Sequence, residues 1–378
     1  MRPLLTVDPA DWQAVHRALR SRLDDDGPAV FPTADSAAAG DTPQVDDQVA
    51  LVIQTSGSTG RPKRVMLSER ALRASARATD AALGGSGQWL LCLSPAFVAG
   101  SQLLVRSLLA GIEPVAGPLG GFRASAFARA ADAMTHARRY TALVPAQLSR
   151  LVAAGEADAA VRDAVARLDA LLIGGQALPA SLAARARDLG YRVVRTYGSS
   201  ETATGCVYDG RPIGDARLRT VDGALEIAGS MLADGYLGDP EATAAAFHVD
   251  GGVRWYRTGD LAEIDREGRL HVLGRADDVV ISGGVKVSLG RVEAVVRELP
   301  GMAEAVVVRA PSPWGEVPVV VAAGEASIAL EAIRSHVGTA LGAAARPDRV
   351  VSLPRLPLLP TGKPDRRALE ELVAHPPA

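Results

Sequence analysis

The chain has 378 residues, of which 48% are hydrophobic and 22% charged, an ordinary composition for a folded protein that excludes disordered and fibrous classes. Its 41 basic and 43 acidic residues leave a net charge of −2, which excludes a dedicated nucleic-acid or anionic-membrane binder, since such proteins carry a basic excess. No apolar run is long enough for a signal peptide or a membrane span, so we expect a cytoplasmic protein with no membrane insertion.

The predicted elements begin with an amphipathic helix over 8–24, with Asp8 as N-cap and Pro9 at its first position. A long loop rich in Asp, Pro, Gly and Ala follows over 24–47. Short apolar strands and Ala-rich helices then alternate, which predicts an α/β domain with a largely parallel sheet. The strands are 51–54, 89–93, 140–144, 170–173 and 192–196, and the helices include 68–82, 99–110, 123–138, 146–154 and 180–189.

From about residue 206 the pattern changes to short strands and Gly turns, as at 224–228 and 269–273, which predicts an irregular β region. A domain boundary falls in the polar stretch 274–278. Beyond it, strands and helices alternate on a smaller scale. We therefore expect a large N-terminal domain over 1–274, a small α+β domain over 278–378 and a hinge between them. The small domain's predicted strands are 279–282, 305–309, 317–322 and 349–353, and its helices are 288–299, 326–341 and one after Pro364.

Cysteine and lysine are both scarce. The two cysteines, Cys92 and Cys206, cannot form a disulfide framework or a four-cysteine zinc site, and we expect buried thiols in a reducing compartment. Of the 41 basic residues only three are lysine: Lys63, Lys286 and Lys363. Because arginine does not replace lysine at a tight site, these positions indicate sites that need a compact ammonium. Compositional drift toward arginine is the alternative.

A loop of small hydroxyl and glycine residues follows the predicted strand 51–54. Its backbone N–H groups, hydroxyls and one ammonium are the parts of an anion cradle. It is not a Walker A loop, because the lysine comes three residues after the second glycine and is followed by Arg64. The loop residues that we expect to bind phosphate are Thr55, Ser56, Gly57, Ser58, Thr59, Gly60 and Lys63.

Four further segments carry polar groups suited to a nucleotide. After the strand 192–196, Tyr197 offers a flat face for a base, Ser200 a hydroxyl for a phosphate and Glu201 a carboxylate suited to Mg²⁺. Asp260, in a tight Thr-Gly-Asp turn, could bridge two ribose hydroxyls. The last two segments are 274–286, which reads GRADDVVISGGVK, and 359–366, which reads LPTGKPDR.

In this order the five segments resemble the motifs of the adenylate-forming superfamily, which includes acyl-CoA synthetases, firefly-type luciferases and adenylation domains. The resemblance covers residues 50–367, and all three lysines fall inside the motifs. It implies an AMP-forming acid–thiol ligase that uses ATP and Mg²⁺. The enzyme would adenylate a small-molecule carboxylic acid, releasing pyrophosphate, and then transfer the acyl group to CoA.

The resemblance also implies a role for each matched residue. Lys363 would bridge the carboxylate and the α-phosphate, Ser200 would contact that phosphate, and Glu201 would bind Mg²⁺. Asp277 would be the hinge of the small domain. The other implied contacts are Thr55 to Lys63 for the β- and γ-phosphates, Gly174, Gly175, Gln176 and Tyr197 for the adenine, Asp260 with Arg275 nearby for the ribose, Phe97 and Gly198 for the acid, and Gly284 and Lys286 on the thiol's entry path.

Only about 50 residues precede the phosphate loop, and short members of this kind are similar to actinobacterial o-succinylbenzoate–CoA ligases of menaquinone biosynthesis. Residues 85–91, 95–106 and 197–210 resemble that subgroup, although Phe97 and Val98 stand where many such ligases carry His. Val98 cannot bind an α-ammonium, which excludes an amino acid as the substrate. Phe97 suits an apolar pocket for an aromatic acid, with core packing as the alternative. Arg106 and Arg195 are candidates for the second carboxylate.

Two other functions remain open from the residues. One is a CoA ligase or carrier-protein-loading enzyme for another aryl or aliphatic acid. The other is a nucleotide-binding protein without catalysis, against which the retained Lys63, Glu201 and Lys363 argue. An Ala-rich surface is also consistent with a homodimer.

Overall fold

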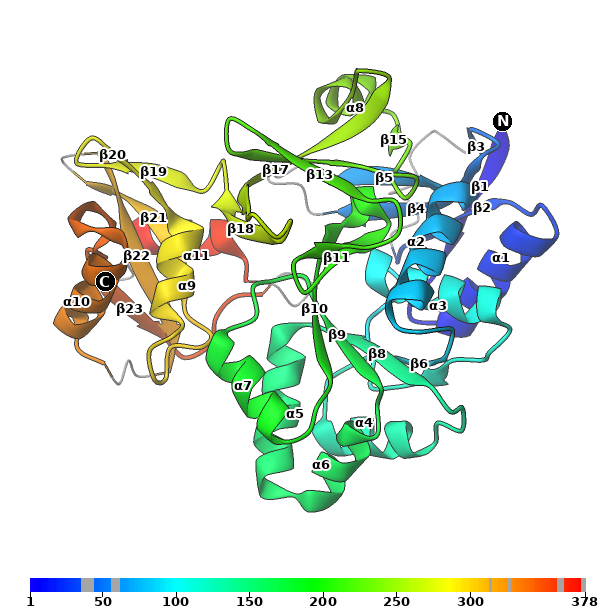
Figure 1. The fold of residues 1–378 in the computed structure, drawn as a ribbon, viewed down its shortest axis with the longest axis horizontal. Helices are drawn as coiled ribbons and strands as arrows, with labels where there is room; N and C mark the ends of the chain where they lie inside the picture. Colours follow the sequence, from blue (N-terminus) through cyan, green and yellow to red (C-terminus); the bar gives the residue numbers. More distant parts are fainter. Residues whose placement is uncertain (35–43, 56–61, 313–314, 325–327, 359–363, 375–378) are drawn as a thin grey trace.

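The computed structural model describes residues 1–34, 44–55, 62–312, 315–324, 328–358 and 364–374 (Figure 1). Most of the expected phosphate loop, 56–60, and Lys363 therefore lie outside the described residues. Residues 2–212, together with the short strand at 235–236, form two sheets, and each sheet lies on one side of a layer of helices.

The first sheet is mixed and has six strands in the order β15-β5-β4-β2-β1-β3. The second has seven strands in the order β12-β11-β10-β9-β8-β6-β7, of which β10, β9, β8, β6 and β7 are parallel. The strands of the two sheets are β1 (Arg2–Val7), β2 (Ala29–Pro32), β3 (Gln44–Val45), β4 (Val49–Thr55), β5 (Lys63–Ser68), β6 (Gln88–Leu91), β7 (Val115–Ala116), β8 (Arg139–Leu143), β9 (Ala170–Ile173), β10 (Val193–Ser199), β11 (Thr204–Tyr208), β12 (Arg211–Pro212) and β15 (Gly235–Tyr236).

Strand alternation sorts the apolar side chains of the seven-stranded sheet onto two faces. Leu91 and Leu172 face one core, which contains residues of α1 (Trp12–Asp24), α2 (Glu69–Ala82) and α3 (Val98–Ala110) together with the six-stranded sheet. Leu90 and Leu171 face a second core on the opposite side. The helices of that second core are α4 (Ala124–Asp132), α5 (Pro145–Ala157), α6 (Ala159–Ala166) and α7 (Ala180–Asp188), below the sheet in Figure 1.

A third sheet follows, ordered β13-β14-β17-β16 with β18 paired to β17. The last part of the chain forms a small sheet ordered β20-β19-β22-β21 with β23 on β22. The remaining elements are β13 (Arg217–Val221), β14 (Ala224–Ala228), α8 (Pro240–Ala246), β16 (Phe247–Asp250), β17 (Val253–Ile264), β18 (Leu270–Arg275), β19 (Val279–Ser282), β20 (Val285–Ser288), α9 (Leu289–Val296), β21 (Val306–Ser312), β22 (Gly315–Ala323), α10 (Leu330–Leu341), β23 (Val350–Leu353) and α11 (Arg366–Ala374).

The apolar cores confirm a large N-terminal part and a smaller C-terminal part. The core between the first two sheets includes residues as late as Leu270, and the cores of the small sheet begin at Val280. No apolar cluster of the described residues contains members from both sides of 270–280. The small part lies on the left in Figure 1.

Several expectations about local structure need correction. The first helix starts later than expected, because the side chain of Asp11, and not that of Asp8, accepts from the N–H of Ala14 and caps α1. The stretch 24–47 is not all loop, since β2 is a fully buried strand of four residues and β3 closes the sheet edge. The part of the chain expected to form one largely parallel sheet forms two sheets. Strand β5 was not expected. It pairs antiparallel with β4, and both strands belong to the separate six-stranded sheet.

Both cysteines are free thiols in the cores, as expected. Burial raises the pKa of Cys92 and of Cys206 to about 12, so neither is a reactive thiolate near neutral pH. Among the described residues, no helix has the length and apolar character needed to cross a membrane.

A buried histidine in α1 makes stability depend on pH. Burial lowers the pKa of His16 below 6.5, Arg20 and Arg17 lower it further, and only Glu113 opposes the shift. The unfolded chain therefore binds the proton more tightly, so this contribution is present above pH 6.5 and is lost as the pH falls through the folded-state pKa. We expect the urea midpoint to fall between pH 7.5 and 5.5 more steeply in the wild type than in His16→Gln. Equal pH dependence of the urea midpoint in the two proteins would contradict this role of His16.

Candidate active site

The expected phosphate loop connects two antiparallel strands. Thr55 ends β4, Lys63 begins β5, and the two residues pair across the ladder. The Thr55 hydroxyl donates to the Lys63 carbonyl at 3.4 Å. The strand ends thus hold both ends of the loop together and fix where the lysine side chain begins.

The second expected motif lies where β10 ends. Gly198 is required there by close backbone approach, because a Cβ would lie 2.0 Å from the carbonyl oxygen of Thr204. A single 3-10 turn, Ser200–Thr202, follows at once and carries Ser200 and Glu201. Glu201 is only 8% exposed. The turn therefore places a hydroxyl and a buried carboxylate side by side at the carboxyl end of the sheet.

The backbone after this turn is strained and is held by side chains of the helical layer. Ala203 has φ 49° and Thr204 φ 103°, and a β-branched residue rarely adopts the latter. Ser75 of α2 donates to the Ala203 carbonyl at 2.9 Å, and Arg106 of α3 donates to the Thr204 hydroxyl at 2.9 Å. Thr202 donates to the Thr204 carbonyl at 2.7 Å. These bonds fix the position of the turn that carries Glu201.

Tyr236 connects the two motifs. Its hydroxyl donates to Glu201 Oε1 at 2.9 Å, and the ammonium of Lys63 lies 4.7 Å from the centre of its ring. Burial, and then the charge of Glu201, raises the pKa of Tyr236 far above its usual value, so the hydroxyl stays a donor. One tyrosine thus holds the expected metal-binding carboxylate and supports the expected phosphate-binding lysine.

The surroundings of Glu201 fit a magnesium ion. It is a buried carboxylate that forms no ion pair with any described residue, and a charge in that position calls for a cation. No group of three or more His, Cys, Asp or Glu suited to a metal exists within the described ranges. Mg²⁺ suits such a site, because it is commonly held by one or two carboxylates together with substrate phosphates and water.

A second polar group lies around Asp260 on β17. The Tyr197 hydroxyl donates to Asp260 Oδ2, and Arg275, on the neighbouring strand β18, donates to Oδ1 at 3.4 Å. Burial raises the pKa of Asp260, although the bonds from Tyr197 and the charge of Arg275 oppose it. Arg275 also donates two hydrogen bonds to Asp277, at 2.9 and 3.0 Å. The expected adenine, ribose and hinge residues thus form one hydrogen-bonded chain.

Tyr256 is a buried residue of β17, the strand that also carries Asp260. Burial raises the pKa of Tyr256 well above the usual value, and Glu201, Tyr236 and Tyr197 contribute to the rise. Neither Tyr256 nor Tyr236 was singled out from the sequence. Tyrosine is rare in this chain, with six residues, and the same scarcity argument that selected the lysines would have selected both.

The glycines after β9 lie beside this site. Ile173, at the end of β9, pairs with Arg195 of β10, so Gly174 follows next to Thr196. A Cβ on Gly174 would lie 2.4 Å from the Thr196 hydroxyl oxygen. Gly175 is exposed and has φ +80°, which favours glycine, and the half-buried Gln176 follows it. This close approach brings Gly174, Gly175 and Gln176 beside the strand that carries Tyr197.

The two arginines proposed for a second carboxylate are in opposite environments. Arg195 is an exposed residue paired with Asp209 at 3.3 Å. Arg106 is 4% exposed, stacks over Trp89 at 5.1 Å, and forms no ion pair with any described residue. Its Nε is buried without a hydrogen-bond partner. Of the two, only Arg106 therefore has free charge in an enclosed place.

Within the described residues, three other expected residues form no hydrogen bond with this cluster. Phe97 precedes α3, is half-buried and belongs to none of the apolar core clusters of the described residues, which favours an exposed pocket wall over core packing. Gly284 and Lys286 belong to the hairpin β19–β20, where Gly283 and Gly284 form a two-residue turn with positive φ. Within the described ranges, no hydrogen bond joins this hairpin to Tyr197, Glu201 or Asp260.

Comparison with known proteins identifies the family. The AMP-binding enzyme family matches residues 5–236, and the AMP-binding enzyme C-terminal domain matches residues 291–363. The chain belongs to the AMP-binding enzyme family. A probable 2-succinylbenzoate–CoA ligase of Mycobacterium tuberculosis is 41% identical over 338 residues, which cover 86% of this chain and 85% of the relative.

Solved structures of AMP-binding enzymes have the same fold. The o-succinylbenzoate coenzyme A synthetase of Bacillus subtilis in complex with AMP is 25% identical with a TM-score of 0.73, covering 85% of this chain and 69% of that one. An amide bond synthetase of Marinactinospora thermotolerans is 27% identical with a TM-score of 0.76, covering 98% and 80%. The family resemblance inferred from the five motifs is thus confirmed across the chain.

Removing one hydroxyl tests the role of Tyr236. We expect Tyr236→Phe to keep the ring beneath Lys63 but to lower pyrophosphate release about tenfold and to raise the Mg²⁺ concentration needed for half-maximal rate, because Glu201 loses a charge-assisted hydrogen bond. Tyr191→Phe is the matched control, since its hydroxyl bonds the Leu151 carbonyl in the other core. An unchanged Mg²⁺ requirement would exclude the positioning role.

Proposed function

We propose that the protein is an ATP-dependent acid–CoA ligase whose acid is o-succinylbenzoate. The observation that carries the proposal is that Arg106 is buried and forms no ion pair with any described carboxylate. It lies against the turn that carries Glu201 and so offers a positive charge to a second carboxylate. The 41% identity with a probable 2-succinylbenzoate–CoA ligase supports the same acid. In this proposal the reaction belongs to menaquinone biosynthesis. Location of the protein in the cytoplasm and formation of a homodimer remain predictions.

The first half-reaction joins the acid to AMP. An oxygen of the carboxylate attacks the α-phosphorus of ATP, the bond from that phosphorus to the bridging oxygen breaks, and pyrophosphate leaves. Attack by one anion on another builds charge at phosphorus, so preorganised cations and N–H donors are the main source of acceleration. Lys63 would bind the outer phosphates, Ser200 the α-phosphate, and Lys363 both reacting groups.

The residues around Tyr197 would bind the rest of the nucleotide. The Tyr197 ring would stack on the adenine beside Gly174, Gly175 and Gln176, and Asp260 would exchange its bonds from Tyr197 and Arg275 for bonds to the ribose hydroxyls. Mg²⁺ held by Glu201 would neutralise phosphate charge. Tyr236 keeps that carboxylate oriented by its hydrogen bond.

The second half-reaction transfers the acyl group to CoA. The thiolate sulfur attacks the acyl carbon, the bond to the phosphate oxygen breaks, AMP leaves, and the thiol proton goes to solvent. Lys363 must withdraw before the thiol reaches this carbon, which requires a mobile small domain. We propose that this domain spans 278–378, that the large domain spans 1–274, and that Asp277 is the hinge, which the separation of the apolar cores between 270 and 280 supports.

The acid would lie between Phe97, Gly198 and Arg106, and the thiol would enter past Gly284 and Lys286. Phe97 provides an apolar wall for an aromatic ring, and Arg106 a charge for the second carboxylate. Val98, next to Phe97, offers no group for an α-ammonium, so the site does not suit an amino acid. Each part of an aromatic dicarboxylic acid thus has a counterpart.

The test is pyrophosphate release with ATP and Mg²⁺ in the presence of o-succinylbenzoate, benzoate or a medium-chain fatty acid, each with and without CoA. We expect turnover that prefers o-succinylbenzoate and yields its CoA thioester. Turnover with another acid only would keep the adenylating mechanism and exclude this acid. Transfer of the acyl group to a holo-carrier protein and not to CoA would identify the carrier protein as the acceptor. ATP binding without pyrophosphate release for any acid would overturn the proposal.

A further inference from the structure

The small domain contains a buried carboxylate that takes no part in the proposed chemistry. Glu293 lies on α9 and is 7% exposed (Figure 1). Its Oε1 pairs with Arg297 Nη2 at 2.8 Å, one turn later in the same helix. Its Oε2 accepts two bonds from other elements, one from Arg366 Nη2 at 2.5 Å and one from the N–H of Val307 at 3.0 Å. Desolvation of buried charges offsets much of their attraction, so the main effect of such a pair is the geometry that it fixes.

Arg366 joins Glu293 to strand β21 by a closed set of hydrogen bonds. Its Nη1 donates to the Val307 carbonyl at 2.7 Å, while the N–H of the same Val307 donates to Glu293. The elements α9, β21 and α11 therefore meet at one guanidinium group. Because that group is rigid and binds two acceptors at once, it fixes both the position and the direction of the first residue of α11.

The residue that is fixed in this way lies three positions after Lys363, the residue that the proposed function places between the carboxylate and the α-phosphate. The two residues between them are held as well. Pro364 forms a bridge with Leu358, and the N–H of Asp365 donates to the Pro357 carbonyl at 2.9 Å. The backbone is therefore fixed from the residue directly after Lys363.

The other end of α9 contacts the expected hinge. Its first residue, Leu289, donates its N–H to the carbonyl of Asp278 at 2.9 Å. Glu293 follows one turn later on the same helix. A line of bonds thus runs from the hinge through α9 and Glu293 to the backbone beside Lys363. A rotation at the hinge that moves α9 would therefore carry the lysine segment with it.

We propose that Glu293 is a positioning residue for adenylation, which acts through Arg366 and holds Lys363 at the place relative to the hinge that the first half-reaction requires. The inference rests on the proposed function, in which Lys363 bridges the reacting groups. Neither Glu293 nor Arg366 touches a substrate or transfers a proton. Their effect on the rate follows because a misplacement of about 1 Å at the reacting centre can cost about 100-fold.

The test uses Arg366→Gln and Glu293→Gln, each alone and combined with Lys363→Ala. We expect each single variant to lower kcat for pyrophosphate release roughly 10–100-fold and to change the KM values for ATP and the acid by no more than about twofold, because the lysine acts in the transition state. In the Lys363→Ala background neither change should slow the reaction further, since no lysine is left to position. Arg366→Lys keeps the charge without the fork and should be intermediate.

Arg297→Gln is the matched control. Arg297 is buried like Glu293 and forms its other ion pair, but its remaining bond goes to the Ala305 carbonyl and not to the segment beside Lys363. We expect the urea midpoint to fall at least as far as in Arg366→Gln, while pyrophosphate release stays within about twofold of the wild type. Thioester formation from synthetic adenylate and CoA should be unchanged in all the variants that retain Lys363, which checks that they fold.

Three results would overturn the inference alone, because each indicates a purely structural role. They are equal losses of both half-reactions in Arg366→Gln, losses that multiply with that of Lys363→Ala, and equal losses of adenylation in Arg297→Gln and Arg366→Gln. Normal adenylation by Lys363→Ala would refute the lysine's role in the proposed function, and with it this inference. A wild type that releases no pyrophosphate with any acid would refute the proposed function itself.

Discussion

Replacement of Lys363 by alanine is expected to slow acyl-adenylate formation by roughly 10²–10³-fold, the loss typical of removing one preorganised group at an anionic transition state. The same variant is expected to convert pre-formed acyl-adenylate and CoA to thioester at the wild-type rate. The asymmetry follows from the proposed mechanism, in which the lysine neutralises charge only while the carboxylate attacks the phosphate. Pyrophosphate release and thioester formation from synthetic adenylate measure the two steps separately.

Lys286→Ala is the matched control for that experiment. Lys286 is also on the small domain, but it belongs to the exposed hairpin β19–β20 and is expected on the thiol's path. Its replacement should leave adenylation unchanged, and any loss should fall on the second step. Equal losses of both half-reactions in Lys363→Ala would exclude the lysine's assignment to the first step.

Arg106→Gln is expected to lower kcat/KM for o-succinylbenzoate by roughly 10²–10³-fold, since removing one partner of a buried charge pair costs about 3–5 kcal/mol. Its kcat/KM for benzoate should fall only severalfold. The reason is that benzoate has no second carboxylate, and glutamine can still donate a hydrogen bond to the Thr204 hydroxyl. The measurement is the ratio of the two kcat/KM values.

That ratio distinguishes binding of the acid from support of the strained turn. Arg106 also holds Thr204, whose φ of 103° is unfavourable, so a purely structural role would lower activity with both acids equally. Arg195→Gln is the control, because Arg195 is exposed and paired with Asp209, and we expect no change in selectivity. Equal losses for the two acids in Arg106→Gln would refute the carboxylate-binding role.

Much of the fold could be predicted because apolar periodicity is local. The strand Ala170–Ile173 and the helix starting at Ala180 were predicted at their observed positions, since continuous apolar runs and amphipathic repeats carry their own signal. Strand β5 was missed because its pairing with β4 depends on a partner across the loop and because its charged residues Lys63 and Arg64 hide the strand pattern. The short buried strand β2 was missed inside a stretch rich in turn-forming residues.

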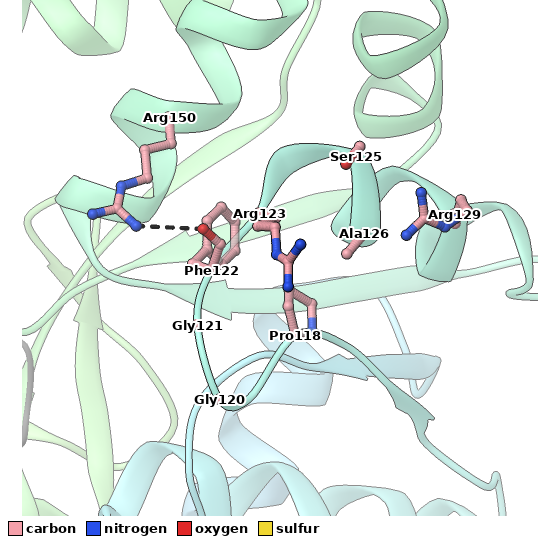
Figure 2. Close-up of a pocket in the computed structure, with 9 residues that line it drawn as sticks. All are labelled: Pro118, Gly120, Gly121, Phe122, Arg123, Ser125, Ala126, Arg129 and Arg150. Atoms are coloured by element: carbon pink, nitrogen blue, oxygen red, sulfur yellow. Dashed lines mark hydrogen bonds between the residues drawn. The ribbon is translucent and has the colours of Figure 1, made fainter.

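The candidate site could be predicted residue by residue only where a motif carries it. Tyr197 and Asp260 were assigned to adenine and ribose from separate motifs, and the structure joins them by a hydrogen bond. Tyr236 had no motif, because its role depends on two residues 35 and 173 positions earlier in the chain. Arg123, Arg129 and Arg150, which line one pocket (Figure 2), could not be singled out either, since three arginines among so many stand out only once their missing ion-pair partners are known.

The sequence by itself determined the family and the kinds of group available for the chemistry. Lysine scarcity and five ordered motifs were sufficient for this, because short segments that bind phosphate, base and metal carry their function in residue type and spacing. Tertiary structure alone decided which groups act on each other. Whether an arginine is a surface charge, like Arg195, or a buried and unpaired one, like Arg106, depends on neighbours that are distant in the chain. Burial and pairing set the energy of a charge, and neither can be read from sequence spacing.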